Sequence, residues 1–254
     1  MKITQARISN SIATFKSSYL SKFNLLDCYN IYKPVVFFGM YDDSDYSALR
    51  RFNNKIVVVW CGTDALMITS ERAKILKQVP ATHIVKSEFM SDDLKKFGIP
   101  HKILPVSWQQ YDIKPLPLGD CIFHYGQSDF YGHKHLNKIE KATGLKIYRT
   151  TKDTYTKDQL LEVYRKCFIG LRLTKHDGLP NTVLEMGMMG RKSIYNGGIP
   201  SSIRWRNIDD VISSITNINK NRSHENIHEV SWKIKNFINI GTEWLEYEDR
   251  TDIK

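Results

Sequence analysis

Short apolar runs alternate with stretches in which apolar side chains recur every three or four residues along the first part of the chain. The runs predict β-strands, and the periodic stretches predict amphipathic helices. The predicted strands are 35–40, 55–60, 82–87 and 101–106, and the predicted helices are 44–52, 70–79 and 88–98. Ser44 can cap the first helix, and Gly98 closes the last as a helix-ending glycine. This alternation indicates parallel βαβ units whose strands are buried on both faces.

The pattern stops at residues 107–120 and then starts again. Pro115, Pro117 and Gly119 interrupt this span, which has no apolar period and is typical of a linker. Beyond it, the predicted strands are 120–126, 145–150, 167–174 and 192–197, and the predicted helices are 133–144, 156–166, 179–190, 207–218 and 228–246. Thr156 and Gln159 have the spacing of a capping box. We therefore expect two lobes, 1–112 and 119–222, followed by a C-terminal helix and tail at 223–254.

Each lobe is expected to be a small Rossmann-like α/β unit with a parallel sheet. Ligands of open parallel sheets bind beyond the carboxyl ends of the strands. Two such lobes that face each other form a central cleft, so the segments that follow the strands are the places to search for functional side chains.

The segment KHDGLPNTVLEMGMMGRK, residues 175–192, follows one of these strands. Gly178 permits a tight strand-to-helix turn, and Pro180 suits the first turn of a helix. The backbone N–H groups at the helix start, with the positive end of the helix dipole, suit a phosphate or a polyhydroxylated ring. Asp177 and Glu185 bracket this helix start. Carboxylates accept hydrogen bonds from vicinal hydroxyls such as those of sugars and ribose.

The stretch CFIGLRLTKHDGLPNTVLEMGMMGRKSIYNG resembles the E-x7-E signature of retaining GT-B glycosyltransferases, in particular the GT4-like family. Asp177 stands at the first acid of that signature and Glu185 at the second, while Leu173 and Thr174 replace the usual Pro-Ser. The resemblance implies that Glu185 binds the nucleotide ribose and that Asp177 binds the donor sugar. It implies further donor contacts at the helix start and from basic side chains near the diphosphate. These are Gly178, Leu179, Pro180, Asn181, Thr182, Lys134, Arg172 and Lys175.

Asp64 follows the predicted strand 55–60 and so lies where ligands bind. It is a candidate for contact with the acceptor or the donor sugar, and an Asx turn or helix cap explains it equally well. YDDSDY at 41–46 resembles a DxD metal motif, but a solvated loop with an N-cap is the favoured interpretation.

A metal site is not expected from the remaining ligand-type residues. The histidines at 124, 133 and 135 are interpreted as structural or solvated, and the four cysteines are far apart with no paired spacing. The resemblance likewise implies catalysis without a metal and no cofactor besides the nucleotide-sugar co-substrate. Reduced cysteines indicate a cytosol-like compartment.

The chain carries a net charge of +10, spread over both halves, which favours anionic partners without naming one. Ile8, Ile12, Phe15, Tyr19 and Phe23 recur at near-helical spacing. This pattern predicts a helix packed on the first lobe, with weak membrane-surface association as the alternative. No apolar run is long enough to span a membrane and no signal-peptide core is present, so a cytoplasmic location is expected.

The sequence therefore predicts a glycosyltransferase that moves a sugar from a nucleotide-sugar donor to an acceptor, with retention. A saccharide acceptor is favoured over DNA, because no single basic stripe with interleaved aromatics is found. Two alternatives stay open. One is a phage or viral enzyme that glycosylates a hydroxymethylated DNA base, which the small size and basic charge also suit. The other is a degenerate nucleotide-binding scaffold module. The oligomeric state is not predicted.

Overall fold

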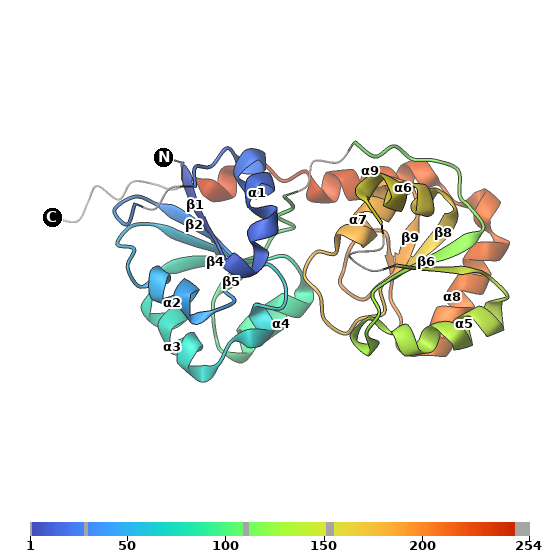
Figure 1. Ribbon diagram of the computed structural model, residues 1–254, viewed down its shortest axis with the longest axis horizontal. Helices are drawn as coiled ribbons and strands as arrows, with labels where there is room; N and C mark the ends of the chain where they lie inside the picture. The colour runs from blue at the N-terminus through green and yellow to red at the C-terminus, as the bar shows by residue number, and fades with distance from the viewer. Residues whose placement is uncertain (1, 28–29, 109–111, 151–154, 247–254) are drawn as a thin grey trace. The chain divides into compact units, whose positions relative to one another are not determined.

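The computed structural model describes residues 2–27, 30–108, 112–150 and 155–246, so Cys28 lies outside the described residues. The chain divides into two compact units (Figure 1). Unit 1 comprises Met1–Gln110, His176–Leu179 and Ile240–Lys254, and unit 2 comprises Tyr111–Lys175 and Pro180–Asn239. Each unit is built around one five-stranded parallel sheet.

The sheet of unit 1 has its strands in the order in which they occur along the chain. They are β1 (Gln5–Ile8), β2 (Val35–Phe38), β3 (Ile56–Val59), β4 (Ala81–Val85) and β5 (His101–Ile103). The helices of this unit are α1 (Lys16–Phe23), α2 (Asp43–Leu49), α3 (Ser70–Gln78) and α4 (Glu88–Lys96), with 3-10 helices η1 (Asn10–Phe15), η2 (Ala65–Met67) and η6 (Glu243–Leu245). The strands and helices predicted between residues 35 and 106 are confirmed, and β1 was not predicted.

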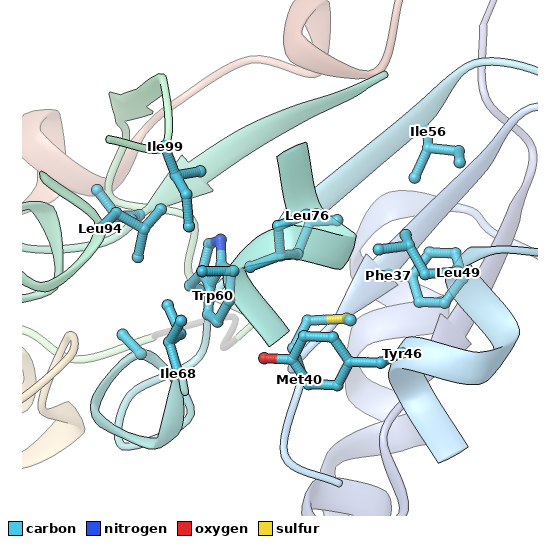
Figure 2. Packing of buried hydrophobic residues seen from close by; sticks show 14 of the residues in the cluster. Phe37, Met40, Tyr46, Leu49, Ile56, Trp60, Ile68, Leu76, Leu94 and Ile99 are labelled. Carbon is cyan, nitrogen blue, oxygen red and sulfur yellow. The ribbon is translucent and has the colours of Figure 1, made fainter. Parts of the chain in front are cut away.

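Side chains of the central strands alternate between two apolar cores. Phe37 and Val58 point into one core with the fully buried Trp60, on the face that α2, α3 and α4 cover (Figures 1 and 2). Phe38 and Val59 point into the other core, which α1 covers. Burial on both faces explains why β2 and β3 are continuous apolar runs in the sequence.

The start of α2 differs from the prediction. Asp42, not Ser44, is the N-cap, and its side chain accepts from the backbone N–H groups of Ser44 and Asp45. The Asp45 side chain in turn accepts from the Asp42 backbone N–H, which completes a capping box. The carboxylates of YDDSDY therefore organise this turn, as the N-cap interpretation proposed, but Asp45 is buried and not solvated.

The near-helical spacing at the N-terminus does not form one helix. Ile8 lies in β1 and Phe15 ends η1, so only Tyr19 and Phe23 lie on an α-helix. Ile12, Tyr19 and Phe23 are buried in the core of unit 1. The packing that was predicted on the first lobe is therefore present, and no described helix is long and apolar enough to cross a membrane.

The sheet of unit 2 has the order β10-β9-β8-β6-β7. Its strands are β6 (Cys121–Tyr125), β7 (Ile147–Thr150), β8 (Cys167–Leu171), β9 (Lys192–Ile194) and β10 (Ser202–Ile203). Its helices are α5 (Leu136–Thr143), α6 (Lys157–Arg165), α7 (Asn181–Met188), α8 (Ile208–Lys220) and α9 (Ile227–Ile238), with 3-10 helices η3 (Asp129–Tyr131), η4 (His133–His135) and η5 (Arg222–His224). The capping box predicted at Thr156 and Gln159 is confirmed at the start of α6.

The strand order of unit 2 changes direction between β6 and β8. The chain runs from β6 outward to β7 and then returns to place β8 on the other side of β6. Helices α5 and α8 cover one face of the sheet, and α6, α7 and α9 cover the other (Figure 1). A crevice for ligands is expected outside the carboxyl ends of β6 and β8, because the connections leave the sheet in opposite directions there.

Candidate functional site

The segments that follow β6 and β8 pack against each other at the carboxyl edge of the unit 2 sheet. Gly132 has φ +79°, and a Cβ there would press against the side chain and backbone of Leu173. Glycine is therefore required both for the left-handed backbone and for the close approach. The two segments together border the point where the strand order reverses.

Arg172 leaves the end of β8 and is buried between two tyrosines. Its guanidinium lies 4.2 Å from the ring centroid of Tyr131 and 5.1 Å from that of Tyr125. Cation–π contacts of this kind hold a guanidinium in place. Lys134 and Lys175 lie on the same two segments and are exposed. The three basic side chains predicted near a diphosphate therefore come from the two loops at the reversal point.

His124 supports this edge from within the sheet. Its Nε2 atom is 2.9 Å from the backbone oxygen of Tyr131, and burial lowers its pKa to about 4. A neutral, buried imidazole agrees with the structural interpretation of His124. Among the residues that the structure describes, no group of three or more His, Cys, Asp or Glu side chains could hold a metal ion.

Pro180 was expected in the first turn of helix α7. It is instead the N-cap, in an extended conformation, and the helix begins one residue later. No side chain caps this start, and Asn181 and Thr182 in the first turn are partly exposed. Gly170 on β8 lets the helix lie close to the sheet, since a Cβ there would meet the Sδ atom of Met186 at 2.7 Å.

Glu185 is a buried carboxylate in the second turn of α7, with 2% of its surface exposed. Its Oε1 atom pairs with the Lys157 ammonium, and its Oε2 atom accepts from the Tyr164 hydroxyl at 3.0 Å. Both partners come from α6. A carboxylate offers about four acceptor sites, and these two donors occupy one on each oxygen.

Asp177 belongs to a segment that groups with unit 1. Its backbone oxygen accepts from the Ser87 hydroxyl at 2.7 Å, and its Oδ1 atom accepts from the Gly178 N–H at 2.8 Å. Nearby, the His176 Nε2 atom lies 2.7 Å from Asp93 Oδ2 in a buried pair. A Cβ at Gly178 would come within 3.1 Å of the Cys61 backbone oxygen, so glycine permits this approach.

Asp64 is fully buried inside the loop that follows β3. Its two oxygens accept from the backbone N–H groups of Met40, Cys61, Gly62 and Ala65, at 2.7 to 3.1 Å. This geometry is that of the Asx turn and cap, which was the alternative to a sugar contact. Asp64 fixes the shape of the loop and does not reach the surface.

The candidate residues from the sequence fall into two groups. Unit 1 holds Asp64, Asp177, Gly178 and Leu179, whereas unit 2 holds Lys134, Arg172, Lys175, Pro180, Asn181, Thr182 and Glu185. Sequence reasoning missed Lys157 and Tyr164, which contact Glu185 from α6. Tyr164 is a buried residue of α6, and no local pattern marks Lys157 as the partner of a residue 28 positions away.

No protein-family model matches the sequence, and no curated protein matches it. The fold is similar to that of a mutant of TarM from S. aureus in complex with fondaparinux, alpha-GlcNAc-glycerol and UDP, with a TM-score of 0.60 and 10% identity over 83% of this chain and 53% of that one. A second structure of TarM gives a TM-score of 0.59 and 11% identity, and the match covers 92% of this chain and 55% of that one. Sucrose-phosphate synthase from Thermosynechococcus elongatus gives a TM-score of 0.58 and 10% identity, and the match covers 90% of this chain and 73% of that one.

The chain spans about half the length of the TarM structures that it matches. At these identities the similarity establishes the fold. The fold class expected from the sequence, GT-B-like with two small Rossmann-like lobes and parallel sheets, is confirmed.

Proposed function

We propose that this protein is a glycosyltransferase that takes a sugar from a nucleotide-sugar donor. The structural neighbours TarM and sucrose-phosphate synthase are glycosyltransferases, which supports the reaction class. One TarM complex contains UDP and alpha-GlcNAc-glycerol, which supports a nucleotide donor and a saccharide product for that fold. In our proposal unit 2 binds the donor nucleotide, and the acceptor is a saccharide.

The observation that carries the proposal is the environment of Glu185. An ionised carboxylate is strongly disfavoured in a buried position unless donors surround it. Lys157 and Tyr164 supply one donor to each oxygen, and the unused acceptor capacity matches the two vicinal hydroxyls of a ribose. Glu185 would thus bind the ribose of the donor through both hydroxyls.

The departing diphosphate needs positive charge, which the same edge of unit 2 offers. Arg172 is held between two tyrosine rings, and Lys134 and Lys175 are exposed on the adjoining loops. The N-terminus of α7 adds the positive end of a helix dipole. We propose that these groups stabilise charge on the leaving group as the glycosidic bond breaks, so that no metal ion is needed.

Asp177 is assigned to the donor sugar, and by resemblance to retaining enzymes the transfer proceeds with retention. The assignment of Asp177 rests on its position in the motif and on the partial exposure of its side chain. Positioning and electrostatic stabilisation then supply most of the rate enhancement.

A panel of nucleotide-sugars tests the proposed function. Thermal-shift screening should select one donor, and that donor should be hydrolysed slowly without an acceptor, in excess EDTA as well as without it. Asp177→Asn should bind the donor and lose hydrolysis. Asp92 is an exposed acid of the same unit, and Asp92→Asn should keep both donor binding and hydrolysis. If no nucleotide-sugar of the panel raised the melting temperature, the proposal would be wrong. Binding without hydrolysis by the wild type would identify a scaffold module instead.

A further inference from the structure

A buried lysine that the donor site does not use lies at the carboxyl edge of the unit 1 sheet. Lys86 directly follows β4 and has 7% of its surface exposed. Among the described residues no carboxylate lies within 4.0 Å of its ammonium. Charged side chains are seldom buried in this way without a partner of opposite charge. The Lys86 ammonium therefore has no direct ion pair among the described residues.

The partners that Lys86 does have are neutral. Its Nζ atom donates to the Tyr19 hydroxyl at 2.8 Å, and it also interacts with the thiol of Cys61. Burial raises the pKa of that thiol, so Cys61 stays protonated at neutral pH. An ammonium has three N–H groups, and a third donor remains after these two contacts.

Asp64 interacts electrostatically with this cluster, but its oxygens already accept hydrogen bonds from the backbone. Its oxygens accept from four backbone N–H groups of the loop after β3, as described above. The carboxylate is fully buried and organises that loop. Asp64 therefore attracts the Lys86 ammonium electrostatically without a direct hydrogen bond. The third N–H group of Lys86 stays available.

Further hydroxyl groups belong to residues that interact with Tyr19 and Cys61. The Tyr41 hydroxyl interacts with the Thr63 side chain, and both residues reach solvent. Beside Gly62 a Cβ would meet nothing nearer than the Tyr41 hydroxyl, at 3.9 Å. A small group can therefore enter beside Gly62. Parallel sheets bind their ligands at this edge of the strands.

We propose that Lys86, with the hydroxyls of Tyr19, Tyr41 and Thr63, forms an oxyanion subsite on unit 1 that takes a phosphate or carboxylate group of the acceptor. The subsite uses none of the side chains assigned to the donor, and only its assignment to an acceptor rests on the proposed function. The acceptor is then an acidic saccharide rather than a neutral one. Hydroxyl donors suit both oxyanions, and the ammonium supplies a charge-assisted hydrogen bond.

Cys61 provides a local probe of this subsite, because its thiol contacts the Tyr19 hydroxyl at 3.6 Å and the residue is partly exposed. Alkylation by iodoacetamide would be followed by peptide mass spectrometry in inorganic phosphate, in acetate and in chloride at equal ionic strength. We expect phosphate or acetate to slow alkylation of Cys61 at least threefold relative to chloride, with Cys121 of unit 2 unaffected. The anion that protects better identifies the acidic group of the acceptor.

Variants separate the subsite from a general effect of salt. Lys86→Met should abolish the protection of Cys61, whereas Lys102→Met, an exposed lysine on β5 of the same unit, should keep it. Equal alkylation of wild-type Cys61 in all three salts, or equal protection in Lys86→Met, would overturn the proposal.

A second readout needs no variant and covers the case in which Lys86→Met does not fold. Acetylation of wild-type lysines by an activated ester would be mapped by mass spectrometry. Phosphate should slow the acetylation of Lys86 but not that of Lys102. Acetylation of Lys86 at an unchanged rate would contradict the subsite. The outcome is separable from the donor site, because Glu185 belongs to unit 2 and its described partners are Lys157 and Tyr164, not Lys86.

Discussion

The Tyr164 hydroxyl of α6 donates a hydrogen bond to Glu185 Oε2 of α7 at 3.0 Å, and both side chains are buried. Hydrogen bonds to charged groups contribute about 1.5–3 kcal/mol. We predict that Tyr164→Phe lowers the free energy of unfolding by about that amount, because one oxygen of a buried carboxylate loses its donor. Urea denaturation measures this change. Tyr148→Phe, on the partly exposed face of β7, is the control and should change stability by less than ~0.5 kcal/mol. Equal effects would mean that the bond contributes nothing.

Arg191 is fully buried and has no carboxylate among its described partners. It donates instead to backbone oxygens where the C-termini of α6 and α7 meet the linker. These are the oxygens of Leu116, Pro117, Tyr164, Arg165, Cys167 and Met189. Carbonyl oxygens at helix C-termini carry partial negative charge, which explains how an arginine is accommodated here although burial lowers its pKa to about 10.

Arg191→Lys should destabilise unit 2 by roughly 3 kcal/mol or more, because an ammonium cannot reach donors in several directions and leaves buried carbonyls without partners. The midpoint of chemical denaturation measures the loss. Arg206→Lys changes an exposed arginine paired with Asp210 on α8, and we expect it to shift stability by less than ~0.5 kcal/mol. A similar, small shift for both variants would show that the carbonyl network is dispensable.

Two buried histidines should make stability depend on pH. Burial lowers the pKa of His83 in unit 1 and of His124 in unit 2 to about 4, compared with ~6.5 in an unfolded chain. Between these values the unfolded chain binds protons that the folded protein does not. The free energy of unfolding should therefore fall as the pH drops from ~6.5 to 4, by up to about 3 kcal/mol for each histidine.

Replacing both histidines by glutamine should flatten this slope, whatever the variant does to stability at neutral pH. His228→Gln, at an exposed position on α9, should leave the slope as it is. Thermal unfolding at pH 4.5, 5.5, 6.5 and 7.5 gives the comparison. A slope that survives in the double variant would assign the acid sensitivity to carboxylates.

The sequence predicted the central strands because burial on both faces leaves a signal that needs no partner information. The apolar run of β3 and the capping box of Thr156 and Gln159 are local patterns, and both are present in the structure. Strand β1 was missed because Gln5, a polar residue, is buried within it, where its side chain bonds the backbone of Asn30 and Lys33. Such a contact depends on the fold and leaves no periodic trace.

The same reasoning explains the candidate site. Gly178 and Pro180 mark a strand-to-helix turn by their own backbone preferences, so the motif could be located from the sequence. Lys157 and Tyr164 act on Glu185 through the packing of α6 beside α7, which sequence spacing does not encode. Asp64 illustrates the converse: its position after a strand suggested chemistry, and its four backbone donors assign it to the loop instead.

The central claim is that Glu185 binds the two ribose hydroxyls of the donor nucleotide. Calorimetry with the preferred nucleoside diphosphate and its 2′,3′-dideoxy analogue tests it most directly, on the wild type, on Glu185→Gln and on the control Glu162→Gln, an exposed acid of α6. We predict that the wild type and the control bind the ribose form at least about tenfold more tightly, as expected for ~1.5–3 kcal/mol from charge-assisted hydrogen bonds. Glu185→Gln should bind both forms with nearly equal, weak affinity. A Glu185→Gln variant that keeps the full preference for ribose would contradict the account.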